Sequence, residues 1–214
     1  MESSEPTHPD FWNTRYLAGT TPWDLGRIPA NLEGFLKRRP KETIPAKTRV
    51  LVPGCGSGHE VKALAEAGYD VRAIDLAPAA VARARQNVGP RFAERVIVGD
   101  FFTQDLGPAA SFDLVYERYF LAALPPQLRE AYRDRVAQLL KYGGILAGCF
   151  YYQETKPADG PPFGLAWGEA DELFGRYYVL VKDDPIKDSL PRFAGRERWQ
   201  ERRRTAFAGA AKPA

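Results

Sequence analysis

The sequence predicts an α/β fold in which a mostly parallel sheet is covered by helices. From Arg49 onward, short runs of β-branched residues alternate with stretches whose apolar residues recur at helical spacing, which is typical of a parallel sheet with crossover helices. A glycine-rich turn, residues 53–60, also joins the first of these runs to the first helical stretch. The 214 residues suit one domain, or one domain with an N-terminal extension.

The predicted strands are short and apolar. The clearest of them cover residues 49–53, 70–75, 95–98, 112–116 and 145–152. The last of these is apolar throughout, as expected for a buried central strand. A further strand is predicted over 177–181, and residues 198–207 form a candidate final strand whose alternation is poor.

The predicted helices have apolar residues on one side. Before the first strand, Ile28, Leu32, Phe35 and Leu36 mark an amphipathic helix, and Val61 and Leu64 lie on one side of the helix after the glycine turn. Further helices are expected over 79–87, 128–140 and 170–174, with Gly143 and Gly144 ending the second of these.

Composition narrows the classes of protein. A formal net charge of +3 is too small to indicate nucleic acid or membrane as a partner. The two cysteines, Cys55 and Cys149, lack metal-ligand spacing, so we expect free thiols in a reducing compartment, with Cys149 packed in a strand. The N-terminal residues have no signal-peptide core, and no apolar run approaches about 20 residues. We therefore expect a soluble, cytoplasmic protein.

The turn P-G-C-G-S-G-H-E carries the strongest local signal. Gly54, Gly56 and Gly58 follow G-x-G-x-G spacing, which lets the backbone approach a ligand and directs helix N-terminal amides at it. A tight strand-to-helix turn without a ligand is the alternative. Asp75 favours the first interpretation, because it ends the second strand about twenty residues on, where a carboxylate accepts hydrogen bonds from ribose hydroxyls. Capping of the following helix is its other possible role.

The spacing of the glycines also favours one ribose-containing cofactor over another. A dinucleotide site prefers G-x-G-x-x-G, in which the third glycine packs beneath a pyrophosphate, whereas here that glycine comes one residue early. The third strand ends in Gly99-Asp100-Phe101-Phe102, which supplies a carboxylate and aromatic rings for an adenine. S-adenosylmethionine, whose sulfonium is attracted to aromatic faces, is therefore preferred over a nicotinamide cofactor.

Aromatic residues are dense in the segment 11–29. It contains Phe11, Trp12, Tyr16 and Trp23, which can supply the faces that a sulfonium needs. A hydrophobic arm packed against the core is the alternative interpretation.

Four motifs in this order make the chain resemble the thiopurine S-methyltransferase superfamily, which includes plant-type halide/thiol methyltransferases. They are T-P-W-D-L-G at 21–26, V-P-G-C-G-S-G-H-E at 52–60, G-D-F-F at 99–102 and G-P-P-F at 160–163. The resemblance implies a Rossmann-like class I S-adenosylmethionine-dependent methyltransferase with a mostly parallel seven-stranded sheet. It further implies that an arm and helix in residues 1–40 cover the donor site of a core in residues 41–214.

The resemblance also implies the site residues. The donor, which leaves as S-adenosylhomocysteine, is assigned to Trp12, Trp23, Gly54, Gly56, Asp75, Leu76, Asp100, Phe101 and Tyr116. Arg118 and Tyr16 are assigned to catalysis, and Tyr119 and Phe163 to the acceptor. Arg118 lies where thiopurine enzymes have arginine and the halide/thiol branch has tyrosine, while Tyr16 lies where that branch often has tryptophan. The branch, and with it the acceptor, stays open between a thiol, sulfide, halide or thiopurine.

Methyl transfer to such an acceptor is an in-line displacement, and soft anions need little help from a base. We expect Arg118 to hold the acceptor anion, or alternatively to pair with Glu117 or another carboxylate. His59 is expected to make a polar contact rather than act as a base. No metal spacing occurs, and the arginine-rich stretch 196–204 is expected to be a solvated face.

Other functions remain as rivals. The nearest is an O- or N-methyltransferase of a larger metabolite, and the more distant ones are a nicotinamide-dependent oxidoreductase and a non-catalytic nucleotide- or nucleic-acid-binding module. We expect a small-molecule acceptor, no nucleic acid, no membrane and a monomer.

Overall fold

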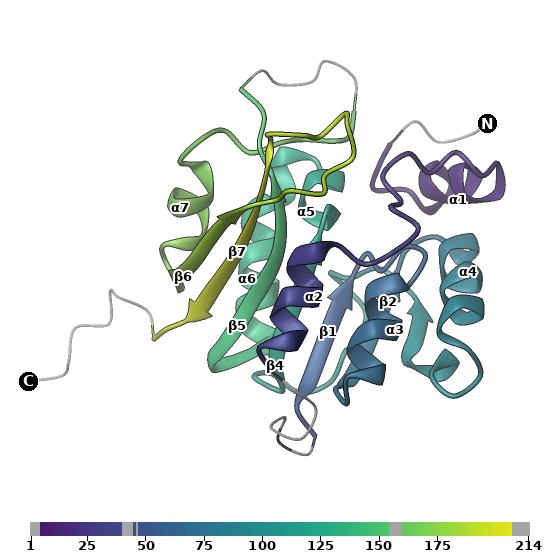
Figure 1. Cartoon of the computed structure of the whole chain (residues 1–214), viewed down its shortest axis with the longest axis horizontal. Coiled ribbons are helices and arrows are strands. Elements are labelled where there is room, and N and C mark those ends of the chain that lie inside the picture. Colours follow the sequence, from purple (N-terminus) through teal and green to yellow (C-terminus); the bar gives the residue numbers. More distant parts are fainter. Residues whose placement is uncertain (1–4, 40–44, 46, 155–159, 207–214) are drawn as a thin grey trace, which may run out of the picture.

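The computed structural model describes residues 5–39, 45, 47–154 and 160–206, and its core is a seven-stranded sheet between two layers of helices (Figure 1). Along the sheet the strands have the order β3-β2-β1-β4-β5-β7-β6. Their bounds are β1 Arg49–Pro53, β2 Asp70–Asp75, β3 Val96–Val98, β4 Phe112–Arg118, β5 Leu140–Tyr151, β6 Tyr178–Pro185 and β7 Glu197–Arg204.

The strands from β3 to β5 run parallel, and β7 alone is antiparallel to its neighbours β5 and β6. The predicted fold class is therefore confirmed. Strand order reverses between β1 and β4, because the chain passes from β1 outward to β3 and then returns to β4. In sheets of this kind the ligand lies at that reversal, beyond the carboxyl ends of the strands.

Helices cover both faces of the sheet. Two sets of buried side chains define the layers: one includes residues from α2, α3 and α4, and the other includes residues from α5, α6 and α7. The helices are α1 Pro9–Leu17, α2 Ala30–Lys37, α3 His59–Glu66, α4 Pro78–Val88, α5 Phe120–Ala123, α6 Arg129–Leu139 and α7 Glu169–Phe174, with short 3-10 turns η2 Ala93–Arg95 and η3 Pro126–Leu128.

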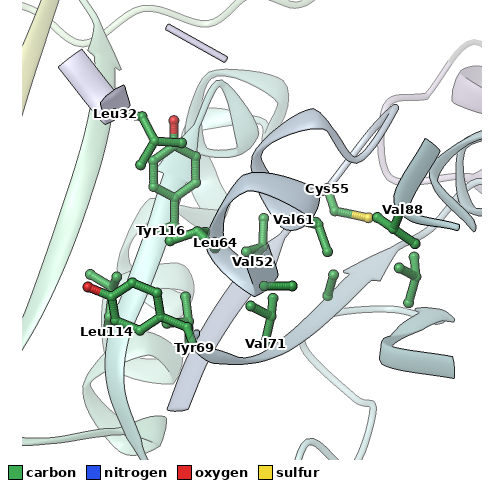
Figure 2. Close-up of a cluster of buried hydrophobic side chains, with 14 of the residues drawn as sticks. Leu32, Val52, Cys55, Val61, Leu64, Tyr69, Val71, Val88, Leu114 and Tyr116 are labelled. Atoms are coloured by element: carbon green, nitrogen blue, oxygen red, sulfur yellow. The ribbon is translucent and has the colours of Figure 1, made fainter. Parts of the chain in front are cut away.

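The first core, drawn in Figure 2, follows from the periodicity of the chain. Val52 and Val71 from neighbouring strands meet Val61 and Leu64, which lie one turn apart on α3. All four are at most 4% exposed. Leu32 closes this layer from α2, so the amphipathic helix expected before the first strand covers the same face as α3.

The boundary between α6 and β5 differs from the prediction. We expected Gly143 and Gly144 to end the helix, but it ends at Leu139, and both glycines lie within β5. Leu140 already has extended backbone, with ψ 139°, and pairs with Phe112 of β4. A register shift between Phe112 and Leu114 then absorbs the extra residues, so pairing with β4 overrides the helical spacing of the apolar stripe.

The expectation of a solvated arginine-rich face is wrong. Residues 197–204 form β7, an interior strand of the sheet. Arg202 is 1% exposed, and its guanidinium donates to Asp171 at 2.7 Å and to Gln200 at 3.0 Å. The poor apolar alternation arises because buried hydrogen-bonded polar groups take positions that apolar residues usually fill.

Residues 9–17 form helix α1, which the sequence analysis did not predict. The two cysteines are buried free thiols, as predicted, and Cys149 lies in β5. The proposed boundary between residues 40 and 41 lies outside the described residues. In the described part of the chain, no helix has the length and apolar character needed to cross a bilayer.

Candidate active site

A cavity of about 720 Å³ opens at the carboxyl ends of β1, β2 and β4, where the strand order reverses. Its size lies within the range of about 300–1,000 Å³ common for small-molecule sites. All but one of the predicted site residues line it: Trp12, Tyr16, Trp23, Gly54, Gly56, Asp75, Leu76, Asp100, Phe101, Tyr116, Arg118 and Tyr119. The exception is Phe163.

Two glycines shape the turn that follows β1. Gly54 and Gly56 have φ values of 57° and 53°, in the left-handed region where side chains are strained. A Cβ atom on Gly54 would lie 2.4 Å from Cδ2 of Phe120, and one on Gly56 would lie 2.8 Å from the phenol oxygen of Tyr16. Only glycine therefore lets this backbone lie against the cavity wall.

Asp75 ends β2 and fixes the same turn. One carboxylate oxygen accepts the backbone N–H of Gly56 at 2.9 Å, and the other accepts that of Ala77 at 2.9 Å. Burial raises the pKa of Asp75, although these N–H donors act to lower it. Asp75 thus supports the start of α4, the second of the two roles considered for it, and it also lines the cavity.

The N-terminal arm closes the cavity from the side of α4. The side-chain oxygen of Asn13 accepts the backbone N–H of Ala79 at 2.8 Å, and Arg83 donates to the carbonyl of Tyr16 at 3.0 Å. α1 therefore lies beside α4, as Figure 1 shows.

Three aromatic rings of the arm lie against one another at the cavity. The Trp12 and Trp23 rings meet edge to face at 5.5 Å, and the Trp23 indole N–H donates to the Tyr16 phenol oxygen at 3.3 Å. Burial raises the pKa of Tyr16, so this phenol is neutral at ordinary pH. The rings can surround a cationic ligand group.

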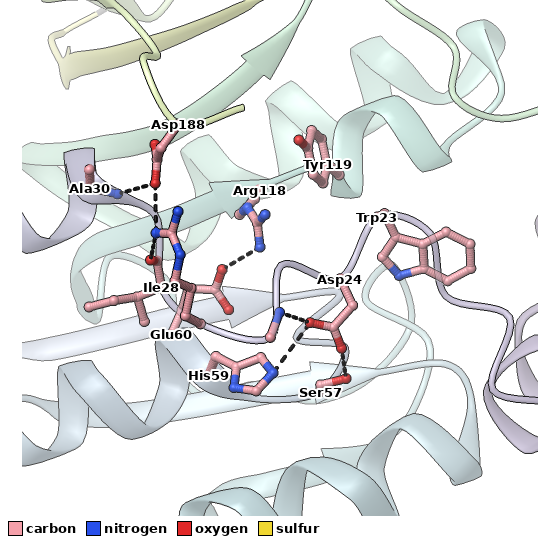
Figure 3. Close-up of polar contacts among 12 residues, drawn as sticks. Trp23, Asp24, Ile28, Ala30, Ser57, His59, Glu60, Arg118, Tyr119 and Asp188 are labelled. Carbon is pink, nitrogen blue, oxygen red and sulfur yellow. Dashed lines mark hydrogen bonds and ion pairs between the residues drawn. The ribbon is translucent and has the colours of Figure 1, made fainter. Parts of the chain in front are cut away.

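A polar contact that the sequence did not predict ties the arm to the glycine turn (Figure 3). Asp24 accepts hydrogen bonds from the Ser57 hydroxyl and from the backbone N–H of Gly26, and its carboxylate lies 3.3 Å from Nε2 of His59. Burial acts to raise the pKa of Asp24, but the bonds from Ser57 and Gly26 outweigh it, and the pKa is lowered. His59 therefore makes a polar contact.

Arg118 pairs with Glu60 rather than with its neighbour in the sequence, Glu117. Its guanidinium donates to Glu60 at 2.8 Å (Figure 3). Glu117 instead accepts the Tyr132 hydroxyl at 2.8 Å and the backbone N–H of Leu121 at 3.1 Å. Glu60 was not among the predicted site residues, but its sequence position could have identified it. It is the last residue of the glycine-turn motif, which places it in the first turn of α3 beside the cavity.

The wall beyond Arg118 is aromatic and cationic. Tyr119 lies between the Arg118 guanidinium, 5.0 Å from the ring centroid, and the Phe193 ring at 5.1 Å. Arg192 also lines the cavity there. The structure places Phe163 elsewhere: it lines a small separate pocket, and its backbone N–H donates to the carbonyl of Ala122 at 2.7 Å.

One phenol of the cavity wall has no partner. Tyr116 is 1% exposed, and its hydroxyl oxygen is buried without a hydrogen bond among the described residues. Burial raises its pKa, so the group is a neutral donor at ordinary pH, without a partner among the described residues. Together with the aromatic rings, the carboxylate of Asp75 and the close glycine backbone, it fits a ligand with a cationic centre and a ribose. The described part of the chain holds no group of three His, Cys, Asp or Glu residues able to bind a metal.

Known sequences that are similar to this chain include thiopurine and thiol methyltransferases. Residues 7–202 match the model of the family described as thiopurine S-methyltransferase (TPMT). A thiopurine S-methyltransferase of Xanthomonas campestris pv. campestris (strain 8004) is 32% identical over 202 residues, covering 86% of this chain and 90% of the relative. A probable thiol methyltransferase 2 of Arabidopsis thaliana is 32% identical over 165 residues, covering 76% and 70%. Thiocyanate methyltransferase 1 of the same plant is 29% identical, covering 89% and 84%.

Solved structures show the same fold. A Burkholderia thailandensis 1,6-didemethyltoxoflavin-N1-methyltransferase with bound S-adenosylhomocysteine superposes with a TM-score of 0.72 at 19% identity, covering 92% of this chain and 87% of that one. A magnesium protoporphyrin IX methyltransferase from Synechocystis PCC 6803 with bound S-adenosylmethionine gives 0.69 at 18% identity, covering 92% and 95%. At these identities the likeness supports the fold alone.

Proposed function

Because the chain belongs to the thiopurine S-methyltransferase family, we propose that its acceptor is a small aromatic or heteroaromatic thiol bound against the contacting rings of Tyr119 and Phe193. The protein is an S-adenosylmethionine-dependent S-methyltransferase that acts on thiol or thiopurine-like acceptors. The wall of the cavity beyond Arg118 supports an aromatic thiol as the acceptor within this class.

That wall combines rings with positive charge. Tyr119 and Phe193 supply aromatic rings to this part of the cavity lining, and Arg118 and Arg192 add two cations. A thiolate conjugated to a ring carries negative charge and a flat apolar surface, so it matches both features. This pairing of rings and cations is the observation that carries the proposal.

The donor lies on the opposite side in this proposal. Asp75 would accept the ribose hydroxyls, Asp100 and Phe101 would contact the adenine, and Leu76 would pack between them. Gly54 and Gly56 would bring backbone against the methionine part, and Trp12, Tyr16 and Trp23 would enclose the sulfonium. All of these residues line the cavity.

The chain's contribution to catalysis is then position and environment. S-adenosylmethionine supplies a methyl group on a sulfonium. The residues around it would hold the acceptor sulfur about 3–3.5 Å behind the methyl carbon, an arrangement that can lower the barrier by roughly 7–11 kcal/mol. Aromatic walls exclude water and disperse charge as the ions neutralise each other. Arg118, already paired with Glu60, would orient the anion rather than carry a proton.

The test is a panel of acceptors with S-adenosylmethionine, in which both headspace and solution are analysed for methylated product. Thiophenol and a thiopurine should be methylated, whereas iodide, hydrosulfide and a catechol should give little product. Methyl iodide or methanethiol as the main product would contradict the aromatic acceptor and place the chain with the halide/thiol branch. Methylation of the catechol alone would favour an O-methyltransferase.

We further propose that the protein acts as a cytoplasmic monomer on small molecules and does not bind nucleic acid. The free thiols of Cys55 and Cys149 suit a reducing compartment. Arg202 of the arginine-rich strand β7 is buried and paired with Asp171, so it is not available to a nucleic-acid phosphate. Size-exclusion chromatography with light scattering, and retention on a DNA column at low salt, test these statements. A stable dimer or salt-dependent retention would contradict them.

A further inference from the structure

Glu197 is a buried carboxylate that the proposed function does not use. It begins β7 and is 5% exposed. One oxygen accepts the phenol hydroxyl of Tyr119 at 2.5 Å, and the other is buried with no hydrogen-bond partner among the described residues. A buried carboxylate is costly unless its oxygens are paired, and buried polar atoms in native structures are paired as a rule. The free oxygen therefore calls for a chemical role.

Tyr119 connects this carboxylate to the cavity. It lines the cavity wall, its φ is 63°, and its ring is held between Phe193 and the Arg118 guanidinium. Because its hydrogen is donated to Glu197, the phenol oxygen can only accept a further hydrogen bond. Such an oxygen can accept the hydrogen of an S–H group.

The carboxylates that line the cavity are already engaged. Asp24 accepts from Ser57 and Gly26, Asp75 accepts from two backbone N–H groups, and Glu60 holds Arg118. The pair of Tyr119 and Glu197 differs from these because one of its carboxylate oxygens has no donor.

We propose that Tyr119 and Glu197 form a proton relay that deprotonates a neutral thiol acceptor during methyl transfer. This rests on the proposed function and adds the group that takes the proton. The acceptor S–H bond breaks as its proton passes to the phenol oxygen of Tyr119, while the Tyr119 proton passes to Glu197. The sulfur forms its bond to the methyl carbon, and the donor's sulfonium–methyl bond breaks with its electron pair left on the donor sulfur. Glu197, now a neutral acid, returns one proton to solvent by the same route.

Tyr119 is the catalytic residue in this scheme and Glu197 is a positioning residue that acts through it. Burial, followed by the hydrogen bond to Glu197, raises the pKa of Tyr119, so a free phenolate does not accumulate and the two protons move together. Cys149 and Tyr151 of β5 also interact electrostatically with Glu197, and burial raises the pKa of both. The Arg118 guanidinium acts on Tyr119 in the opposite sense, to lower its pKa. Arg196 and Arg192 lie near Tyr151 and act to lower its pKa.

The test compares two thiols that differ in acidity. Thiophenol is largely ionised at neutral pH and needs no base, whereas an alkanethiol, with a pKa of about 8.5 or higher, stays protonated. Tyr119→Phe and Glu197→Gln are compared with wild type on both. The amide in Glu197→Gln can still accept the Tyr119 hydroxyl, so it keeps the ring in place but cannot take a proton. Tyr151→Phe, a neighbouring phenol that does not line the main cavity, is the matched control.

We expect both relay variants to lower kcat/KM for the alkanethiol by about 10²-fold or more at neutral pH, and to lower kcat/KM for thiophenol far less. Their alkanethiol turnover should recover as pH rises through the pKa of the thiol. S-adenosylhomocysteine binding, measured by calorimetry, should match wild type, and Tyr151→Phe should behave as wild type throughout.

Equal loss with both thiols, or no loss with the alkanethiol, would overturn the relay and leave the proposed function standing. A wild-type protein that methylates neither thiol would overturn both.

Discussion

Arg118 and Glu60 form an ion pair of 2.8 Å that joins the end of β4 to the first turn of α3 across the cavity wall. Their side chains are only 11% and 9% exposed. A pair so enclosed is sensitive to the loss of one partner, because the remaining charge is left without compensation. Activity and stability should therefore respond together when Arg118 is replaced.

Arg118→Ala should reduce turnover and also lower the free energy of unfolding by about 3–5 kcal/mol, since Glu60 is left buried and unpaired. Adding Glu60→Gln should restore part of the stability but none of the turnover. Denaturant unfolding and acceptor kinetics on the single and double variants check this. Unchanged turnover of every accepted substrate in Arg118→Ala would refute a role in the site.

Asp75→Ala should weaken binding of S-adenosylhomocysteine by about 1.5–3 kcal/mol, the usual range for hydrogen bonds to a charged group. The control is Asp105→Ala. Asp105 accepts the N–H of Gly107 two residues on, as Asp75 does with Ala77, but lies outside the cavity. Calorimetry of both variants separates loss of a turn from loss of a ligand contact. Equal donor affinity in Asp75→Ala and wild type would exclude the ribose role.

Asp24→Ala should loosen the arm, because it removes the acceptor shared by Ser57, Gly26 and His59. Trypsin should then cut near Arg15 at least about tenfold faster, since one hydrogen bond to a charged group contributes about 1.5 kcal/mol or more. S-adenosylhomocysteine should slow cleavage of wild type. Asp10→Ala, which changes an exposed residue of α1, is the control. Equal cleavage of all three proteins would show that this contact does not hold the arm.

Glu117→Gln should become progressively more stable than wild type as pH rises from about 5 to 8. Burial raises the pKa of Glu117 from its ordinary 4.5 to about 7. The folded state therefore binds this proton more tightly than the unfolded chain, so its stabilising contribution is complete below pH 4.5 and is lost as pH rises through about 7.

The size of that loss is about 3 kcal/mol for a shift of this order. Urea unfolding of both proteins across the pH range measures it. A constant difference between them at all pH values would show that Glu117 titrates near its ordinary value.

The parallel half of the sheet could be predicted because its signal is local. Strands such as 49–53 and 70–75 are short apolar runs, and the residues that end them, with the glycine turn, must meet at one edge of a parallel sheet. The positions of Gly54, Asp75 and Asp100 beside the cavity could therefore be predicted from the chain itself. The β7 strand could be predicted only as a candidate with poor alternation, because its buried side chains are polar and depend on partners far along the chain, such as Asp171 for Arg202.

Contacts between side chains far apart in the chain could not be predicted from the sequence either. The choice of Glu60 rather than Glu117 as the partner of Arg118 depends on which way each side chain leaves its backbone. Phe163 was placed with the acceptor residues on a motif, but the chain around it turns its side chain into a separate pocket. Glu197 lay within a charged stretch whose burial no local pattern revealed.

The position of β7 has a consequence for how the chain folds during synthesis. β7 follows β6 in the sequence but lies between β5 and β6, so β6 has no strand to pair with until residues 197–204 leave the ribosome. A nascent chain that ends near residue 190 can assemble the parallel strands β3 to β5 and the glycine turn, with β5 as an open edge. Open edges of this kind invite pairing with other chains. The chain is therefore most exposed to misassembly late in translation, and the strand that closes the edge also delivers Glu197 to Tyr119.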